Sequence, residues 1–450
     1  MKILVSILSL TIFLNASSVT TAPTLDEAIE ILKKENLEIQ AASIDVKSAK
    51  QDETTVSGKN WGKLELTQDI ARSNDAGNVF GFKLTSREAN FGDFGFSEFS
   101  FTNPNILSLQ PKDLNYPDDR NFFQTKLKYE VPLFTGFALS SYANIMSAMT
   151  KMKSLDKEAL INEKTYQLRK SYYDMALLKD SIKNLTTILN NIKILENMTE
   201  SMIEVGYAKH IDLLEVQAKK GNVERLLLQM EANKELLYHY ISFLLNRKVD
   251  NITTPNADVT MPNFTDTDVL THNIDIQKAT TGLTIRQNML SASQAAYYPT
   301  VGAFGEVATA DNSFLGDAND HKAYTVGARL SWNLFNGGID AANIEKSKLE
   351  HLKMQSQVAL AKNGIKLKLA KIRTEIKSSD DEIASLKKEL QLADAIYKNY
   401  EGRYKEKLSS MSDVIIKQSA QIEKILQLQM AKNKRNEKIF ALEKLANLGE

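Results

Sequence analysis

The side chains with the clearest capacity for chemistry in this sequence are three carboxylates, Asp212, Glu215 and Asp413. Asp212 and Asp413 lie 201 positions apart, and each follows a break in a long helical pattern. Carboxylates that repeat around the axis of an oligomer form a ring, which attracts cations and repels anions in a narrow opening. The structural alternative is that each aspartate caps the first turn of a helix and has no further role.

Other reactive groups do not form a recognisable site in the sequence. There is no cysteine, which excludes disulfides, thiolate metal ligands and a cysteine nucleophile. The five histidines are scattered without metal-ligand spacing, so we expect each to be a surface or packing residue. Phosphate-binding glycine loops and nucleophile elbows are missing, and equal numbers of basic and acidic residues, 56 each, do not favour nucleic acid. We expect no enzymatic activity, cofactor or metal.

The first 18 residues have the pattern of a secretory signal peptide. Lys2 supplies a positive charge, residues 3–14 are apolar, and Ala16-Ser17-Ser18 offers small residues for cleavage, expected between 18 and 22. The apolar run is too short to cross a bilayer. We therefore expect the mature chain to be periplasmic or to lie in the outer membrane.

Four segments alternate apolar with polar residues and are predicted to be strands, at 61–70, 123–133, 300–307 and 324–334. Aromatic residues that anchor strands at a membrane surface stand near their ends: Trp61, Tyr129, Tyr298, Tyr324 and Trp332. Two-faced strands with aromatic residues at their ends are typical of outer-membrane barrels.

A long helical pattern follows the second and the fourth strand. Gly136 and the pair Gly337-Gly338 stand at the two changes of period and are predicted to be strand-to-helix hinges. Each helical run is on the order of 100 Å long at 1.5 Å per residue. Apolar residues at heptad spacing predict that each run folds back as a coiled-coil hairpin, with tips near 206–212 and 407–413.

The two halves of the chain are repeats of one unit, predicted at 19–246 and 264–450 with a connector at 247–263. Most of each half aligns at a constant offset of 201, whereas the first helices align at 237 and pair Asn36 with Asn273. The loop between the two strands is long and rich in phenylalanine in the first repeat, at 71–121, and short in the second, at 311–321. We expect the long loop to hold extended strands and loop rather than helix; a surface loop and a partial plug are the alternatives.

Four strands are too few to close a barrel, because roughly eight is the smallest practical number. Open strand edges are not tolerated in lipid, where each unpaired backbone group costs several kcal/mol. Three chains would supply about twelve strands to a shared barrel. The predicted fold class is therefore mainly α with membrane β-barrel strands; the alternative is a soluble β-sandwich with unusually long helices, in which four strands would hold little core.

Four segments, taken in order, resemble the TolC-type outer-membrane efflux protein family. They are Val131–Phe137, the tip from Gly206 to Asp212-Leu213-Leu214, Tyr297–Thr300 and Leu330–Gly338. No single segment is decisive, but the ordered set covers the whole mature chain. The resemblance implies a homotrimer with an outer-membrane barrel of about twelve strands, an α-helical tunnel in the periplasm and an equatorial collar made by the first helix of each repeat.

The resemblance also implies a function and partners. Family members are passive exit ducts in the outer membrane of Gram-negative bacteria, extending into the periplasm. They serve an inner-membrane pump of the RND, ABC or MFS type, reached through a periplasmic adaptor protein, in efflux or type I secretion. A periplasmic coiled-coil adaptor is the alternative, but it predicts one hairpin beside a lipoyl-like domain, whereas this sequence repeats the hairpin. The sequence does not indicate the substrate.

Carried over residue by residue, the family's selectivity ring is incomplete here. Asp413 matches the first aspartate of that ring, whereas Ile416 stands where the family has a second one. Glu215, one turn from Asp212, is a candidate to replace it.

The family's entrance latch is also altered. Tyr404 matches the latch tyrosine, but Ser409 stands in place of the latch arginine, with Arg403 and Lys407 close by. The family usually has glycine at both tips, whereas this chain has glycine only at the first, Gly206, and Lys407 at the second. Contact with the adaptor is expected at the exposed tip residues: Gly206, Tyr207, Ala208, Lys407, Leu408 and Ser409.

Overall fold

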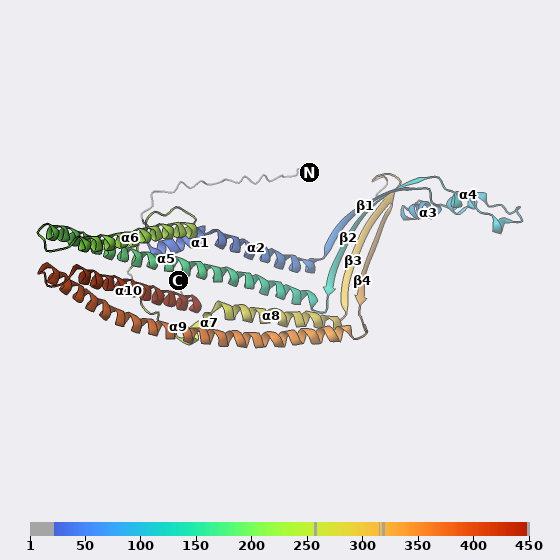
Figure 1. Ribbon diagram of the computed structural model, residues 1–450. Helices are drawn as coiled ribbons and strands as arrows, with labels where there is room; N and C mark the ends of the chain where they lie inside the picture. Colours follow the sequence, from blue (N-terminus) through green and yellow to red (C-terminus); the bar gives the residue numbers. More distant parts are fainter. Residues whose placement is uncertain (1–21, 256–258, 315, 317–319, 448–450) are drawn as a thin grey trace. The chain divides into compact units, whose positions relative to one another are not determined.

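The computed structural model describes residues 22–255, 259–314, 316 and 320–447, so the predicted signal peptide lies outside the described residues. The chain divides into two compact units (Figure 1). The helical unit comprises Met1–Asp45, Ser154–Lys278 and Ala359–Glu450, and the strand unit comprises Val46–Lys153 and Ala279–Val358. These units cut across the two sequence repeats, because each repeat supplies two strands to the strand unit and most of a helical hairpin to the helical unit.

The strand unit is organised around a four-stranded antiparallel sheet in the order β1-β2-β3-β4. The strands are β1 (Lys63–Ser73), β2 (Arg120–Phe134), β3 (Thr300–Asp311) and β4 (Lys322–Ser331). All four were predicted from the sequence, although β3 runs four residues beyond its predicted end at Val307. The central pairing of β2 with β3 joins the two repeats, which leaves β1 and β4 as the edges of the sheet.

The two faces of the sheet differ sharply in polarity. Cross-strand pairing places Leu66, Leu127, Val307 and Tyr324 in one row of an apolar face, and the neighbouring row belongs to a charged face. The apolar face is uncovered in the single chain, since Leu66 is 69% and Tyr324 81% exposed. A contiguous exposed apolar surface of this kind marks contact with lipid or with another protein.

The connection between β1 and β2 contradicts the expectation of a segment without helix. It contains α3 (Ala76–Thr85), α4 (Lys112–Asn115) and three short 3₁₀ turns. Asp75 caps α3 by accepting a hydrogen bond of 3.0 Å from the amide of Asn78, and Phe82 stacks on Phe122 of β2 with ring centroids 4.2 Å apart. The many glycines of this segment favoured a prediction of loop, whereas the Asp75 cap and the contact of Phe82 with Phe122 stabilise α3 as a helix.

Two helical hairpins follow the second and the fourth strand. The first consists of α5 (Ala138–Glu204) and α6 (His210–Leu245), and the second of α9 (Ile339–Lys405) and α10 (Met411–Ala446). The first helix of each hairpin has 67 residues and the second has 36. The corresponding helices of the two hairpins therefore have identical lengths. None of the described helices combines the length and the hydropathy that a membrane-spanning helix requires.

The strand-to-helix hinges have left-handed backbone conformations. Gly136 has φ +60°, and Gly337 and Gly338 have φ +71° and +82°. Phe137, which corresponds to Gly338, adopts the same region with φ +69° and packs its ring edge-to-face on Tyr298, with centroids 5.6 Å apart. Gly136 has no room for a side chain, because a Cβ there would lie 2.9 Å from the Cβ of Tyr298.

Each repeat begins with two helices where we expected one. The pairs are α1 (Leu25–Glu35) with α2 (Leu37–Gly58), and α7 (Asp266–His272) with α8 (Ile274–Gln294). Asn36 and Asn273 interrupt them with extended backbone, ψ 124° and 123°. Each asparagine Oδ1 accepts a hydrogen bond from the amide three residues later, at 3.1 and 3.0 Å. The asparagine thus ends one helix and caps the next.

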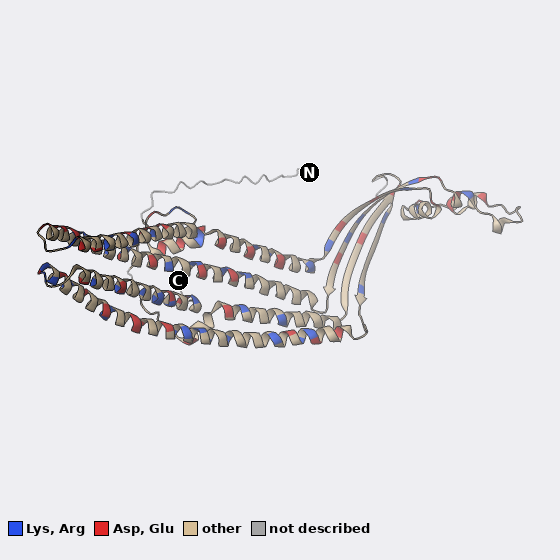
Figure 2. Cartoon of the chain, viewed as in Figure 1, with Lys and Arg blue, Asp and Glu red and all other residues tan. Residues whose placement is uncertain are grey.

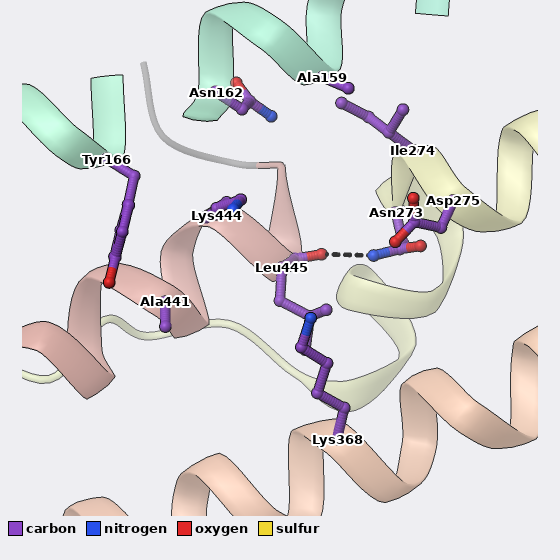
Figure 3. A pocket seen from close by; sticks show the side chains of 10 residues that line it. All are labelled: Ala159, Asn162, Tyr166, Asn273, Ile274, Asp275, Lys368, Ala441, Lys444 and Leu445. Carbon is purple, nitrogen blue, oxygen red and sulfur yellow. Dashed lines mark hydrogen bonds between the residues drawn. The ribbon is translucent and has the colours of Figure 1, made fainter. Parts of the chain in front are cut away.

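The same two side chains attach the helix breaks to the hairpins. Asn36 Nδ2 donates to the carbonyl oxygen of Leu244 at 2.9 Å, and Asn273 Nδ2 donates to that of Leu445 at 2.8 Å (Figure 3). Both asparagines are buried. A cavity of about 180 Å³ lies beside Asn273. These bonds satisfy carbonyls at the ends of α6 and α10 that no intrahelical amide reaches.

The core of the helical unit repeats with the chain. One buried cluster joins α1, α5 and α6, and a second joins α7, α9 and α10. Leu32 in the first cluster and Val269 in the second are fully buried and correspond at the offset of 237. Charged residues of both signs are spread along the helices (Figure 2).

We predict that Asn36→Ala and Asn273→Ala each lower the free energy of unfolding by about 1–3 kcal/mol, because each leaves a buried carbonyl without its donor. The two losses should add, since the sites belong to separate clusters. Chemical denaturation followed by circular dichroism measures both. Asn190→Ala, at an exposed position of α5, is the matched control, and losses no larger than its own would contradict the assigned role.

Candidate functional site

The tips of the two hairpins have the same backbone geometry. The amides of Tyr207 and Leu408 each donate to a carbonyl five residues earlier, both at 2.8 Å. The residue before each donor is left-handed, with φ +76° at Gly206 and +65° at Lys407. This is the helix ending that favours glycine. Lys407 therefore adopts a left-handed backbone that costs a non-glycine residue about 1 kcal/mol of conformational free energy. The sequence alone did not predict this left-handed conformation.

The aspartates singled out in the sequence begin the second helix of each hairpin. The carboxylate of Asp212 accepts the amide of Lys209 at 2.8 Å. The carboxylate of Asp413 accepts the hydroxyl of Ser410 at 2.6 Å and its amide at 3.3 Å. These bonds from Ser410 lower the pKa of Asp413 below its usual value. The capping role weighed from the sequence is thus real, and it keeps a charged carboxylate half-exposed at the tip.

Two contacts join the hairpins to each other within one chain. The ammonium of Lys407 lies 3.4 Å from the centroid of the Tyr207 ring, a cation–π contact between the two tips. Deeper in the unit, the hydroxyls of Thr199 on α5 and Tyr404 on α9 lie 3.3 Å apart. The partner of Tyr404 on the first hairpin is therefore the hydroxyl of Thr199 and not an arginine.

A buried cluster beneath the tips holds the four helices together. Its fully buried residues include Leu185, Ile192, Leu195, Val216, Val223, Tyr397, Met411 and Val414. Thr199, the polar interruption of the apolar spacing in α5, is completely buried and satisfied by the carbonyl of Leu195 at 2.8 Å. Burial raises the pKa of the Tyr404 and Tyr397 hydroxyls above the ordinary value. The tips are thus supported by packed side chains rather than by exposed loop.

The other residues expected at the latch have local roles. Ser409 donates its hydroxyl to the carbonyl of Tyr400 at 3.2 Å. Arg403 donates to the carbonyl of Leu408 at 3.3 Å and lies 5.6 Å from the ring centroid of Tyr400. Both side chains stabilise their own tip, and neither replaces the missing latch arginine in the single chain.

The three candidate carboxylates do not gather in one chain. Within the described part of the chain, Asp212, Glu215 and Asp413 do not meet the 4.8 Å spacing of a shared metal ion. Any ring that they form must therefore be built from several copies. The tips also expose apolar side chains beside these carboxylates: Val205, Tyr207, Ile211, Leu214 and Leu408.

A polar cluster in the strand unit was not foreseen. The side chains of Glu88, Asp311 and His321 bring ligand-type atoms within 4.8 Å of one another. Arg120 forms an ion pair with Glu88 in this cluster, so a guanidinium supplies the positive charge. No spacing in the sequence joins these residues, which come from the β1–β2 connection and the ends of three strands. We interpret the cluster as the anchor of that connection.

Comparisons with known proteins match this chain to outer-membrane efflux proteins and channels. Residues 267–448 match the family model described as outer membrane efflux protein. Similar solved structures include CusC, with a TM-score of 0.78 at 14% identity over 96% of this chain and 95% of that one. VceC from Vibrio cholerae has a TM-score of 0.77 at 14% identity, over 94% of this chain and 96% of that one. CmeC from Campylobacter jejuni has a TM-score of 0.75 at 13% identity, over 96% of this chain and 90% of that one. Curated protein sequences contain no match. The structural likeness establishes the fold.

We predict that Thr199 and Tyr404 are energetically coupled. A double-mutant cycle with Thr199→Val and Tyr404→Phe should give a coupling of about 0.5–1.5 kcal/mol in unfolding free energy, the worth of one buried hydrogen bond. Tyr116→Phe, at an exposed tyrosine, is the control for loss of a hydroxyl. Simple additivity of the two changes would show that the hydroxyls do not interact.

We also predict that stability falls at alkaline pH. The folded chain raises the pKa of Tyr397 and Tyr404 above the ordinary 10.0, so the unfolded chain releases these protons first. The contribution is complete below pH 10 and is lost as the pH rises from there through the raised values. Denaturation midpoints at pH about 9 and about 11 measure the loss. The stability of the Tyr397→Phe/Tyr404→Phe variant should fall less over this pH range. An equal fall in the variant and the unchanged protein would show that these two tyrosines do not cause the loss.

Proposed function

We propose that this chain, whose residues 267–448 match the outer membrane efflux protein family, is a member of that family and forms, as a homotrimer, the outer-membrane exit duct for an inner-membrane pump. The observation that carries the proposal is the four-stranded sheet, whose apolar face is exposed and whose edges are open. A sheet of this kind is stable in lipid only when its edges pair with other copies. Three copies give about twelve strands, enough to enclose a pore.

The duct is passive in this proposal. The sequence has no phosphate-binding loop, so energy comes from the pump, which also selects the cargo. The cargo is a small molecule in an efflux system or a protein in type I secretion. The location follows from the family: the outer membrane of a Gram-negative bacterium, with the helices in the periplasm.

The hairpin tips are the proposed entrance and the docking surface of the periplasmic adaptor. Exposed apolar side chains at Tyr207 and Leu408, beside charged residues, provide the mixed surface that transient protein contacts use. Gly206 and Lys407 give the two tips different surfaces in spite of equal backbone geometry. We therefore infer that the adaptor meets two distinct sites on each chain.

We infer that the entrance is kept closed by contacts other than the family's arginine latch. The Lys407 ammonium on the Tyr207 ring and the paired hydroxyls of Thr199 and Tyr404 hold one hairpin to the other. Opening by separation of the hairpins has to break both contacts. Because neither is a buried ion pair, the closed state is held by modest terms, on the order of 1 kcal/mol each.

The state of the purified protein tests the proposed function directly. We predict that outer membranes contain a complex that migrates as a trimer without heating and as a monomer after heating. Such behaviour follows from strands shared between chains. Recovery of the protein as a soluble periplasmic monomer would contradict the duct and favour a coiled-coil adaptor.

The entrance carboxylates have their own test. We predict that Asp212→Asn with Asp413→Asn weakens cation selectivity and block by divalent cations in planar bilayers, because the ring loses its charge. Asparagine keeps the capping hydrogen bonds, so the tips remain folded. Glu215→Gln in that background measures whether Glu215 contributes. Unchanged selectivity and block in all variants would rule out the ring.

A further inference from the structure

Part of the charged face of the sheet has equal numbers of positive and negative side chains; Arg120, farther along β2 on the same face, pairs with Glu88 outside the sheet. Between the Asp69–Gln124 pair and the Gly302–Arg329 pair the face carries four basic and four acidic residues. We name this set the charge lattice: Lys63, Glu65, Asp69, Lys126, Lys128, Glu130, Glu306 and Arg329. Figure 2 shows both signs along the strands. The set has no net charge.

In two neighbouring rows of the charged face, opposite signs face each other across the strands. Glu65 on β1 is opposite Lys128 on β2, which is opposite Glu306 on β3. In the next row Lys63 is opposite Glu130. Opposite charges on facing positions stabilise a sheet, whereas like charges would repel. The cross-strand register therefore pairs opposite charges in these two rows, whereas Asp69, Lys126 and Arg329 face uncharged residues.

Ion pairs along the strands complete the lattice. Lys63 Nζ lies 2.9 Å from Glu65 Oε1, and Lys128 Nζ lies 2.7 Å from Glu130 Oε1. These side chains remain substantially exposed to solvent in the single chain. Exposed pairs contribute little to stability, so stability alone does not account for eight charges on one face.

Two members of the lattice are held less tightly. Within the described residues, Glu306 and Arg329 have no ion pair within 4.0 Å, and the Arg329 guanidinium lies 6.0 Å from the ring centroid of Phe304. The Phe304 ring covers Gly327, where a Cβ would lie 2.7 Å from it. Glu306 still faces Lys128 across the strands, but changing either charge breaks no ion pair within 4.0 Å, and Lys128 and Glu130 keep the ion pair that they form with each other.

We propose that the charge lattice lines the lumen of the barrel and balances the fixed charge of its wall, so that the barrel adds no charge selection of its own. The inference rests on the proposed function. A wall with net charge accumulates ions of the opposite sign and slows cargo of one sign. A balanced wall stays hydrated and passes anionic, cationic and zwitterionic cargo alike. The apolar face then meets lipid, as outward faces of membrane barrels do.

Reversal potentials in planar bilayers under a potassium chloride gradient test the proposal. Glu306→Lys should shift the reversal potential toward anion selectivity, and Arg329→Glu should shift it toward cation selectivity. The double variant restores the net charge and should return to the wild-type value. It is the matched control, because it alters the same two side chains without altering the sum.

The outcomes separate this inference from the function on which it rests. Trimeric channels whose reversal potential does not respond to Glu306→Lys and Arg329→Glu would overturn the charge lattice and leave the duct intact. Absence of both trimers and conductance in the wild-type protein would overturn the duct itself. Glu306→Gln and Arg329→Gln carry half the charge change and should shift the potential in the same directions by less, whereas shifts unrelated to charge would also reject the lattice.

Discussion

The structure depends on one constraint, which is that β1 and β4 end the sheet with unpaired backbone groups. In water such edges invite aggregation, and in lipid each unpaired amide or carbonyl costs several kcal/mol. The exposed apolar face rules out a sheet that is stable in water by itself. In the proposed trimer, pairing between copies satisfies the edges, and lipid covers the apolar face. The helices, hinges and tips follow from a chain that enters and leaves this sheet twice.

Duplication explains why so much of the fold was predictable. The alternation of apolar and polar residues located all four strands, and one offset of 201 located both hairpins, whose helices match in length residue for residue. Periodicity is a local property of the chain and is visible without coordinates. The positive φ at Gly136 and Gly337 follows from residue type at a change of period.

Features that depend on single side chains were harder to foresee. Asn36 and Asn273 were paired by the repeat, but only the structure reveals that they break a helix, because a lone asparagine also fits within one. The left-handed Lys407 and its contact with Tyr207 follow from tertiary structure that overrides backbone preference. The cluster of Arg120 with Glu88 joins distant segments and has no local signal.

Cysteine cross-linking tests the central claim, that β1 of one copy pairs with β4 of another. The chain has no cysteine, so Thr67→Cys or Asp69→Cys on β1 can be combined with Ala323→Cys or Thr325→Cys on β4. Within one chain these strands lie three strand spacings apart, about 14 Å, beyond the reach of a disulfide at about 7 Å. Oxidation of outer membranes should give covalent dimers and trimers for at least one combination. Exclusively monomeric chains in every combination would contradict the account.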